Sequence, residues 1–339
     1  MITLKNLNQR NAIPAMFDTE KEFIEYTISE ATWLSLPTGE IPTMEKWGFK
    51  KVVDNTVTDE YSNKEDIFHW ESDMDTCLKF WSNLDHNWMV TSFSIKNTTN
   101  YFPNENCIQI IQKSIDFLYS QNIILKHHIN FCFSDHFLED VNNLLIYKNF
   151  KSNNASGTLL YPQNTPTIDN QPYIVININP ATFITQNLIS HIIHELVHFI
   201  DYSNNYISTE YKSFFKLISE YRAKYYQELF YLKNQDLHTI SKCIDRQTSA
   251  YTITCDQLCN NPKAANLYYI FHAIAEIKVQ EFYNAPDIYI KKNKFKILLN
   301  NLVLGCPPPQ VPETENLIFS LNRLLNYGTA LPIHTIEYF

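Results

Sequence analysis

Two histidines and a glutamate form the group in this sequence whose residue types and spacing could do chemistry. His194, Glu195 and His198 lie in the pattern H-E-x-x-H. On an α-helix, residues four apart lie one above the other, with Cβ atoms about 5–6 Å apart. Both imidazoles could therefore bind one zinc ion. Glu195 would lie one step round the helix, beside the metal without being a ligand, where it could take a proton from metal-bound water.

A third metal ligand is needed, because a catalytic zinc ion has three protein ligands and one open position. A further histidine at the spacing of one extended form of the motif is missing, since that position is Asn204. Glu220 in the next predicted helix fits best. Ala223 follows it on the same helix face and is small enough to let the two helices approach closely. Three other carboxylates stay open as alternative third ligands: Asp201, Glu210 and Glu228.

This arrangement resembles the gluzincin branch of the zincin metallopeptidases. Members carry H-E-x-x-H on one helix and a glutamate on the following helix, with alanine three positions later. The resemblance covers about residues 101–245. It implies a Zn²⁺ cofactor held by His194, His198 and Glu220, with Glu195 as the general base.

The same resemblance also implies a place for the substrate. In zincins an edge strand lies over the active-site helix and pairs with an extended peptide, and here that strand would be Gly157–Tyr161. One position departs from the family pattern. Thermolysin-like members have an aspartate four residues after the glutamate ligand, where this chain has Lys224. The groups that support the ligands must therefore differ from the thermolysin-like arrangement or be absent.

Groups behind the ligands could fix the orientation of the imidazoles. Asp201, three residues after His198, could accept a hydrogen bond from an imidazole N–H and fix its tautomer. The alternative is a solvent-facing residue near the helix end. His191 could line the cleft or be an ordinary helix histidine. Five residues could stabilise a developing oxyanion, and the sequence does not choose among them: Arg222, Tyr225, Tyr226, Tyr251 and His272.

The elements that must position these side chains are indicated by hydrophobic periodicity. An apolar stripe predicts a helix that ends near Tyr202, and a second long helix is predicted over residues 209–231. Tyr173–Ile178 alternates like a strand and is predicted to form a hairpin with Gly157–Tyr161. The stripe of the first helix consists of Leu188, Ile192, Leu196 and Phe199.

The remaining regions complete a predicted α+β fold. In the first hundred residues, Thr19 and Glu22 indicate a capping box, residues 66–84 are predicted to form a helix, and Trp88–Ile95 a strand. The predicted zincin-like catalytic core is a small mixed sheet plus an active-site helix and a ligand helix. The predicted domains are an N-terminal α+β region of unknown role at 1–100, the catalytic domain at 101–245, and a mostly helical C-terminal region at 246–339.

Composition disfavours several classes of function. The net charge of −9 disfavours binding to nucleic acids and anionic membranes. The five glycines are too scattered for a dinucleotide fingerprint or a phosphate loop. The seven scattered cysteines indicate reduced thiols. No long apolar run and no secretory signal are found, so a cytoplasmic location is expected, with leaderless export left open.

The sequence therefore predicts a zinc-dependent metallopeptidase that hydrolyses peptide bonds by metal-activated water with Glu195 as general base. The expected partner is a peptide or protein substrate, and the oligomeric state is not predicted. One alternative is a zincin-shaped regulatory or binding protein that holds metal with little or no proteolytic turnover. Another is a helical scaffold in which H-E-x-x-H arises by chance.

Overall fold

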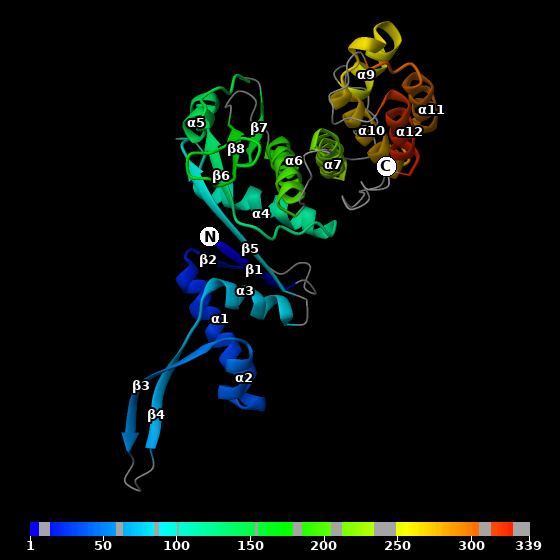
Figure 1. Ribbon diagram of the computed structural model, residues 1–339. Coiled ribbons are helices and arrows are strands. Elements are labelled where there is room, and N and C mark those ends of the chain that lie inside the picture. The colour runs from blue at the N-terminus through cyan, green and yellow to red at the C-terminus, as the bar shows by residue number, and fades with distance from the viewer. Residues whose placement is uncertain are drawn as a thin grey trace. The chain divides into compact units, whose positions relative to one another are not determined.

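The fold is mixed α+β, and the chain divides into two compact units (Figure 1). The first unit is Met1–Ser94 with Lys126–Ile129, and the second is Ile95–Leu125 with Asn130–Phe339. The structure is a computed structural model. It describes residues 1–6, 14–58, 64–84, 88–99, 102–152, 155–178, 185–204, 212–233, 249–304 and 313–327.

The first unit packs three helices and antiparallel strands around an aromatic core. Strand β1 pairs with β2 and with β5, antiparallel in both cases. The predicted capping box is confirmed at the start of α1, where Thr19 and Glu22 cap each other's backbone. Phe23, Phe80 and Trp81 are buried in the core. The elements are β1 (Ile2–Asn6), β2 (Ala15–Phe17), α1 (Glu20–Ser35), η1 (Leu36–Thr38), α2 (Glu40–Lys46), α3 (Met74–Asn83) and β5 (Trp88–Asn97).

The helix predicted over residues 66–84 is wrong in its first part. Strand β4 (Lys64–Glu71) pairs antiparallel with β3 (Lys50–Thr58), and α3 begins only at Met74. Aromatic and β-branched residues favour a strand, and β4 places Phe68 opposite Val53 and Trp70 opposite Lys51. The helix starts later because the Asp73 side chain caps it, accepting a hydrogen bond from a backbone N–H of the first turn.

A three-stranded part of the second unit supports the candidate site. Strand β8 (Tyr173–Asn177) pairs parallel with β6 (Ile129–Ser134) and antiparallel with β7 (Gly157–Leu160). The predicted hairpin of β7 and β8 is therefore confirmed. In the strand order β6-β8-β7, β7 lies at the edge. Residues 174–176 are all buried, so both faces of β8 are covered. Helices α4 (Asn104–Ser120) and α5 (Phe137–Leu144) belong to the same unit.

Helices α6 (Thr185–Asn204) and α7 (Lys212–Lys233) carry the predicted ligands. The predicted apolar stripe of α6 is confirmed, since Leu188, Ile192, Leu196 and Phe199 are all buried. Helix α7 packs against both α6 and α10 (Leu267–Phe282). The other C-terminal helices are α9 (Ala250–Asn260), η3 (Pro262–Ala264), α11 (Ile288–Leu299) and α12 (Thr314–Tyr327). The C-terminal region at 246–339, predicted to be mostly helical, contains only helices among its described elements.

The cysteines of the described ranges carry free thiols. Four of them are buried and Cys259 is exposed. In those same ranges, none of the helices combines the length and apolar character needed to cross a membrane. The four buried cysteines are Cys77, Cys107, Cys132 and Cys255.

Enlarging Ala223 should destabilise the second unit. Ala223 is fully buried in α7, which is packed between two neighbours. Extra methylene groups in a packed interior cost about 1–3 kcal/mol. We expect Ala223→Leu to lower the denaturant midpoint of unfolding. Asn293→Leu, on an exposed position of α11, adds the same side chain without crowding and should leave the midpoint unchanged. Equal midpoints for both variants would contradict tight packing around Ala223.

Candidate metal centre

The two motif histidines face each other from successive turns of α6. Their Nε2 atoms are 3.1 Å apart and their ring centroids 4.8 Å apart. The His198 ring is buried, and the side chain of His194 is 13% exposed. The helical spacing of four residues thus brings two ligand nitrogens together, as the sequence predicted.

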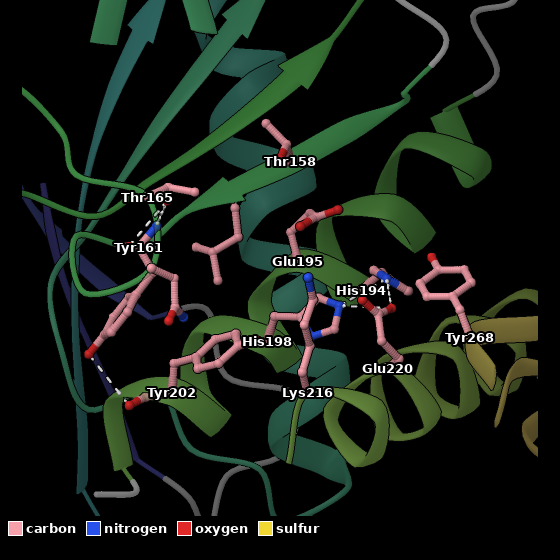
Figure 2. A pocket seen from close by; sticks show the side chains of 12 residues that line it. Thr158, Tyr161, Thr165, His194, Glu195, His198, Tyr202, Lys216, Glu220 and Tyr268 are labelled. Carbon is pink, nitrogen blue, oxygen red and sulfur yellow. Dashed lines mark hydrogen bonds and ion pairs between the residues drawn. The ribbon is translucent and has the colours of Figure 1, made fainter. Parts of the chain in front are cut away.

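Glu220 of α7 completes the group. Its Oε2 atom lies 3.3 Å from Nε2 of His198 and 3.6 Å from Nε2 of His194. The ligand atoms of all three residues lie within 4.8 Å of one another. The structure therefore brings the three predicted ligands to one point, and Figure 2 shows the side chains meeting there.

The separations fit a tetrahedral metal ion. In a tetrahedron with metal–ligand distances of about 2.1 Å, ligand atoms are about 3.4 Å apart, which is close to the 3.1, 3.3 and 3.6 Å separations of this group. Two imidazoles and one carboxylate form a ligand set that suits Zn²⁺ and leaves a fourth position open. The donor set and its spacing thus fit the cofactor that the sequence predicts.

Electrostatics also favour a positive charge between these side chains. Burial acts to lower the pKa of His198, but the Glu220 carboxylate outweighs it and raises that pKa above its ordinary value. Burial acts to raise the pKa of Glu220. The imidazoles of His198, His194 and His272 outweigh burial and hold the pKa of this carboxyl well below its usual range. Glu220 is therefore a buried carboxylate that needs a cation beside it.

Glu195 lies in the same cleft as the three candidate ligands. The cleft has a volume of about 240 Å³. In Figure 2, the Glu195 side chain lies on the side of the imidazoles that faces Thr158 in β7. Gly157 also lies next to Glu195, because a Cβ atom there would be in ordinary van der Waals contact with Cγ of Glu195, at 3.5 Å. The residues that line the cleft are Thr158, Leu159, Tyr161, Asn164, Thr165, His194, Glu195, His198, Tyr202, Lys216, Glu220 and Tyr268.

Helix α10 adds His272, which the sequence singles out only as a possible oxyanion stabiliser, and Tyr268, which it does not single out. Nε2 of His272 lies 3.3 Å from Oε2 of Glu220, and the ring centroids of Tyr268 and His272 are 4.1 Å apart, with the two rings tilted by 44°. Burial lowers the pKa of His272 to about 4 and raises that of Tyr268. The two residues are four apart, and this spacing puts them on one helix face. Only packing of α10 on α7 shows that the face meets Glu220.

Asp201 is linked to His198 by hydrogen bonds through Ser219. The Asp201 carboxylate accepts a hydrogen bond from Oγ of Ser219, at 2.9 Å, and that same Oγ lies 2.8 Å from Nδ1 of His198. Arg222 donates from Nε to both oxygens of Asp201, at 3.1 and 3.2 Å. Asp201 is buried, so the alternative of a solvent-facing residue is wrong. Ser219 gave no signal in the sequence, because its role depends on α7 packing against α6.

The other candidates lie elsewhere. Glu228 pairs with Lys224 at 2.6 Å, an ordinary helix ion pair four residues apart. Glu210 lies outside the described residues. His191 is mostly buried and its pKa is lowered to about 4, by burial first and then by His194 and Lys224. The described lining of the cleft includes none of the alternatives Tyr225, Tyr226 and Tyr251.

Comparisons with known proteins assign no family to the chain. No family model, no curated protein and no solved structure matches it. The resemblance to gluzincins therefore depends on the residues and their spacing, and membership of that branch stays a prediction.

Removing the carboxylate ligand should abolish tight zinc binding. We expect the purified protein to bind one zinc ion per chain, and Glu220→Gln to lose affinity by more than the about 10–100-fold typical of an outer-shell substitution. Elemental analysis and chelator competition measure both. Glu228→Gln is the matched control, because it removes a carboxylate from the same helix and leaves the site intact. Full zinc content in Glu220→Gln would show that another residue is the third ligand.

The zinc-free protein should lose stability as the pH falls. Between the ordinary histidine value of 6.5 and about 4, the unfolded chain binds a proton at His191 that the folded chain does not. This contribution therefore destabilises the fold progressively over that range, by no more than about 3 kcal/mol. We expect His191→Gln to reduce the loss between pH 7 and pH 4.5, measured by denaturant unfolding in chelator. His136→Gln changes an exposed side chain and should leave the loss of stability unchanged. Identical pH profiles for both variants would disprove the assignment of this pH dependence to His191.

Proposed function

We propose that the protein is a zinc-dependent peptidase. The observation that carries this proposal is the convergence of His194, His198 and Glu220 within 4.8 Å, with Glu195 in the same cleft. A structural zinc site is closed by four protein ligands. The described group offers three and adjoins an acidic side chain, an arrangement that suits hydrolysis.

The surrounding elements support a zincin-like core and a peptide substrate. Edge strand β7 provides Thr158 and Leu159 to the cleft wall, beside Glu195. An extended peptide can add to the edge of a sheet through backbone hydrogen bonds. A substrate strand on β7 would place its backbone along the cleft and bring a peptide carbonyl to the three ligands. The proposed substrate is therefore an unfolded or extended polypeptide segment.

The residues of the chain have separate tasks in this mechanism. When bound, zinc polarises a carbonyl oxygen and lowers the pKa of water in its open position. The Glu195 carboxylate takes a proton from the attacking water molecule as its oxygen bonds to the carbonyl carbon. Glu195 then delivers that proton to the leaving amine nitrogen as the C–N bond breaks. Tyr268 borders the cleft beside Glu220 and keeps its phenol proton, because burial raises its pKa.

Neutralising Glu195 should separate metal binding from hydrolysis. We expect Glu195→Gln to keep the zinc content of the wild type and to lose at least about 100-fold in the cleavage rate of an unstructured protein substrate, since general base catalysis contributes about 10²–10⁴-fold. Fluorescein-labelled casein provides the readout, and Glu228→Gln is the control.

Two results would change the proposal. Equal cleavage by Glu195→Gln and the wild type would remove Glu195 from the mechanism. Bound zinc with no cleavage of several unrelated substrates would favour the regulatory or binding protein over the peptidase.

A further inference from the structure

The second ring nitrogen of His198 is held by a buried chain of polar side chains from both ligand helices. We infer that Ser219, Asp201 and Arg222 act together as a positioning relay, which fixes the tautomer and ring orientation of His198 for metal binding. This inference depends on the proposed metal centre. It assigns to Ser219 and Arg222 a role that the H-E-x-x-H pattern does not contain.

The relay is continuous and shielded from solvent. His198 Nδ1 lies 2.8 Å from Ser219 Oγ, and Ser219 Oγ lies 2.9 Å from Asp201 Oδ2. Arg222 Nε closes the chain on the Asp201 carboxylate. Asp201 is 2% exposed, Ser219 0% and Arg222 7%. Bulk water therefore cannot substitute easily for any of these partners.

The hydrogen-bond inventory decides the tautomer of His198. A serine hydroxyl has one proton to donate, and an ionised carboxylate can only accept. The proton of Ser219 is therefore committed to Asp201, and Ser219 Oγ must accept from His198. The Nδ1 atom of His198 must then carry a proton. In the neutral ring the lone pair consequently lies on Nε2, the atom that faces His194 and Glu220.

Arg222 keeps the relay in its working charge state. Burial raises the pKa of the Asp201 carboxyl, and the opposite charge of Arg222 offsets part of this cost. A guanidinium group does not lose its proton in proteins, so Arg222 always presents a positive charge to Asp201. Without Arg222 the carboxylate could take up a proton and donate to Ser219, which would leave the tautomer of His198 undetermined.

The two candidate histidine ligands differ in whether their Nδ1 atom has a hydrogen-bond partner. Among the described residues, Nδ1 of His194 is buried without a hydrogen-bond partner, whereas Nδ1 of His198 has Ser219. Ser219 also directly precedes Glu220 on α7, so one helix supplies a ligand and the support of another ligand. The Asp201–Arg222 pair ties the same two helices together. Losing the relay should therefore weaken metal binding through His198.

Zinc affinity of single variants tests the relay, with competition against a chromophoric chelator as the readout. We expect Ser219→Ala to weaken zinc binding about 10–100-fold, the range for outer-shell partners. Ser219→Thr keeps a hydroxyl and should bind within a few-fold of the wild type. Ser114→Ala is the matched control. Ser114 is an equally buried serine that bonds to the backbone of Ile110 and Ile189, away from the site, and its loss should leave zinc affinity unchanged.

A second measurement covers the case in which Ser219→Ala fails to fold. In the zinc-loaded wild type labelled with ¹⁵N-histidine, the Nδ1 proton of His198 should exchange slowly with water, because it is buried and bonded to Ser219. Fast exchange of that proton would overturn the relay.

The remaining outcomes separate the relay from the metal centre. Zinc bound equally by wild type and Ser219→Ala would overturn the relay alone. A wild type that binds no zinc would overturn the metal centre and the relay with it.

Discussion

The Glu220 carboxylate is buried within 3.3–3.6 Å of three imidazole nitrogens, and it cannot stay charged there without a compensating cation. That requirement organises the centre of the second unit. Helix α6 supplies two imidazoles, α7 supplies the carboxylate, and α10 supplies the third imidazole. Proton sharing can offset the charge in the metal-free protein, because the carboxylate raises the pKa of His198. A divalent cation would compensate the charge more completely, because it would bind the Nε2 lone pairs of His194 and His198 and the Glu220 carboxylate at once.

A second buried charge pair lies behind the first. Asp201 and Arg222 neutralise each other across the interface of α6 and α7. Ser219 joins this pair to His198, so the geometry of one ligand is linked to the packing of the two helices. The ion pairs of Lys224 lie on the same helix but serve other partners, with Glu228 at 2.6 Å and Glu276 at 3.7 Å. Helix α7 therefore carries one candidate ligand, the hydrogen-bond partner of a second candidate ligand, and a separate group of structural ion pairs.

The cleft is shaped as much by β7 and α10 as by the ligand helices. Edge strand β7 lines the cleft beside Glu195, and Tyr268 borders it beside Glu220 (Figure 2). In the proposed mechanism, these boundaries restrict how a substrate would reach the open position of a bound metal ion. An extended backbone along β7 would satisfy them, and this is why we propose a polypeptide substrate and not a compact small molecule.

The sequence by itself determined the local features of this protein. The spacing of His194 and His198, the apolar stripe of α6 and the β7–β8 hairpin all follow from periodicities within one segment, because helices and strands repeat on fixed periods. Where local signals competed, as in residues 66–71, strand pairing with β3 prevailed over the helix that the sequence suggested. Only the tertiary structure decided which distant side chains join the site. His272, Tyr268 and Ser219 meet Glu220 or His198 because α7 packs between α6 and α10, and contacts between helices leave no period in the sequence.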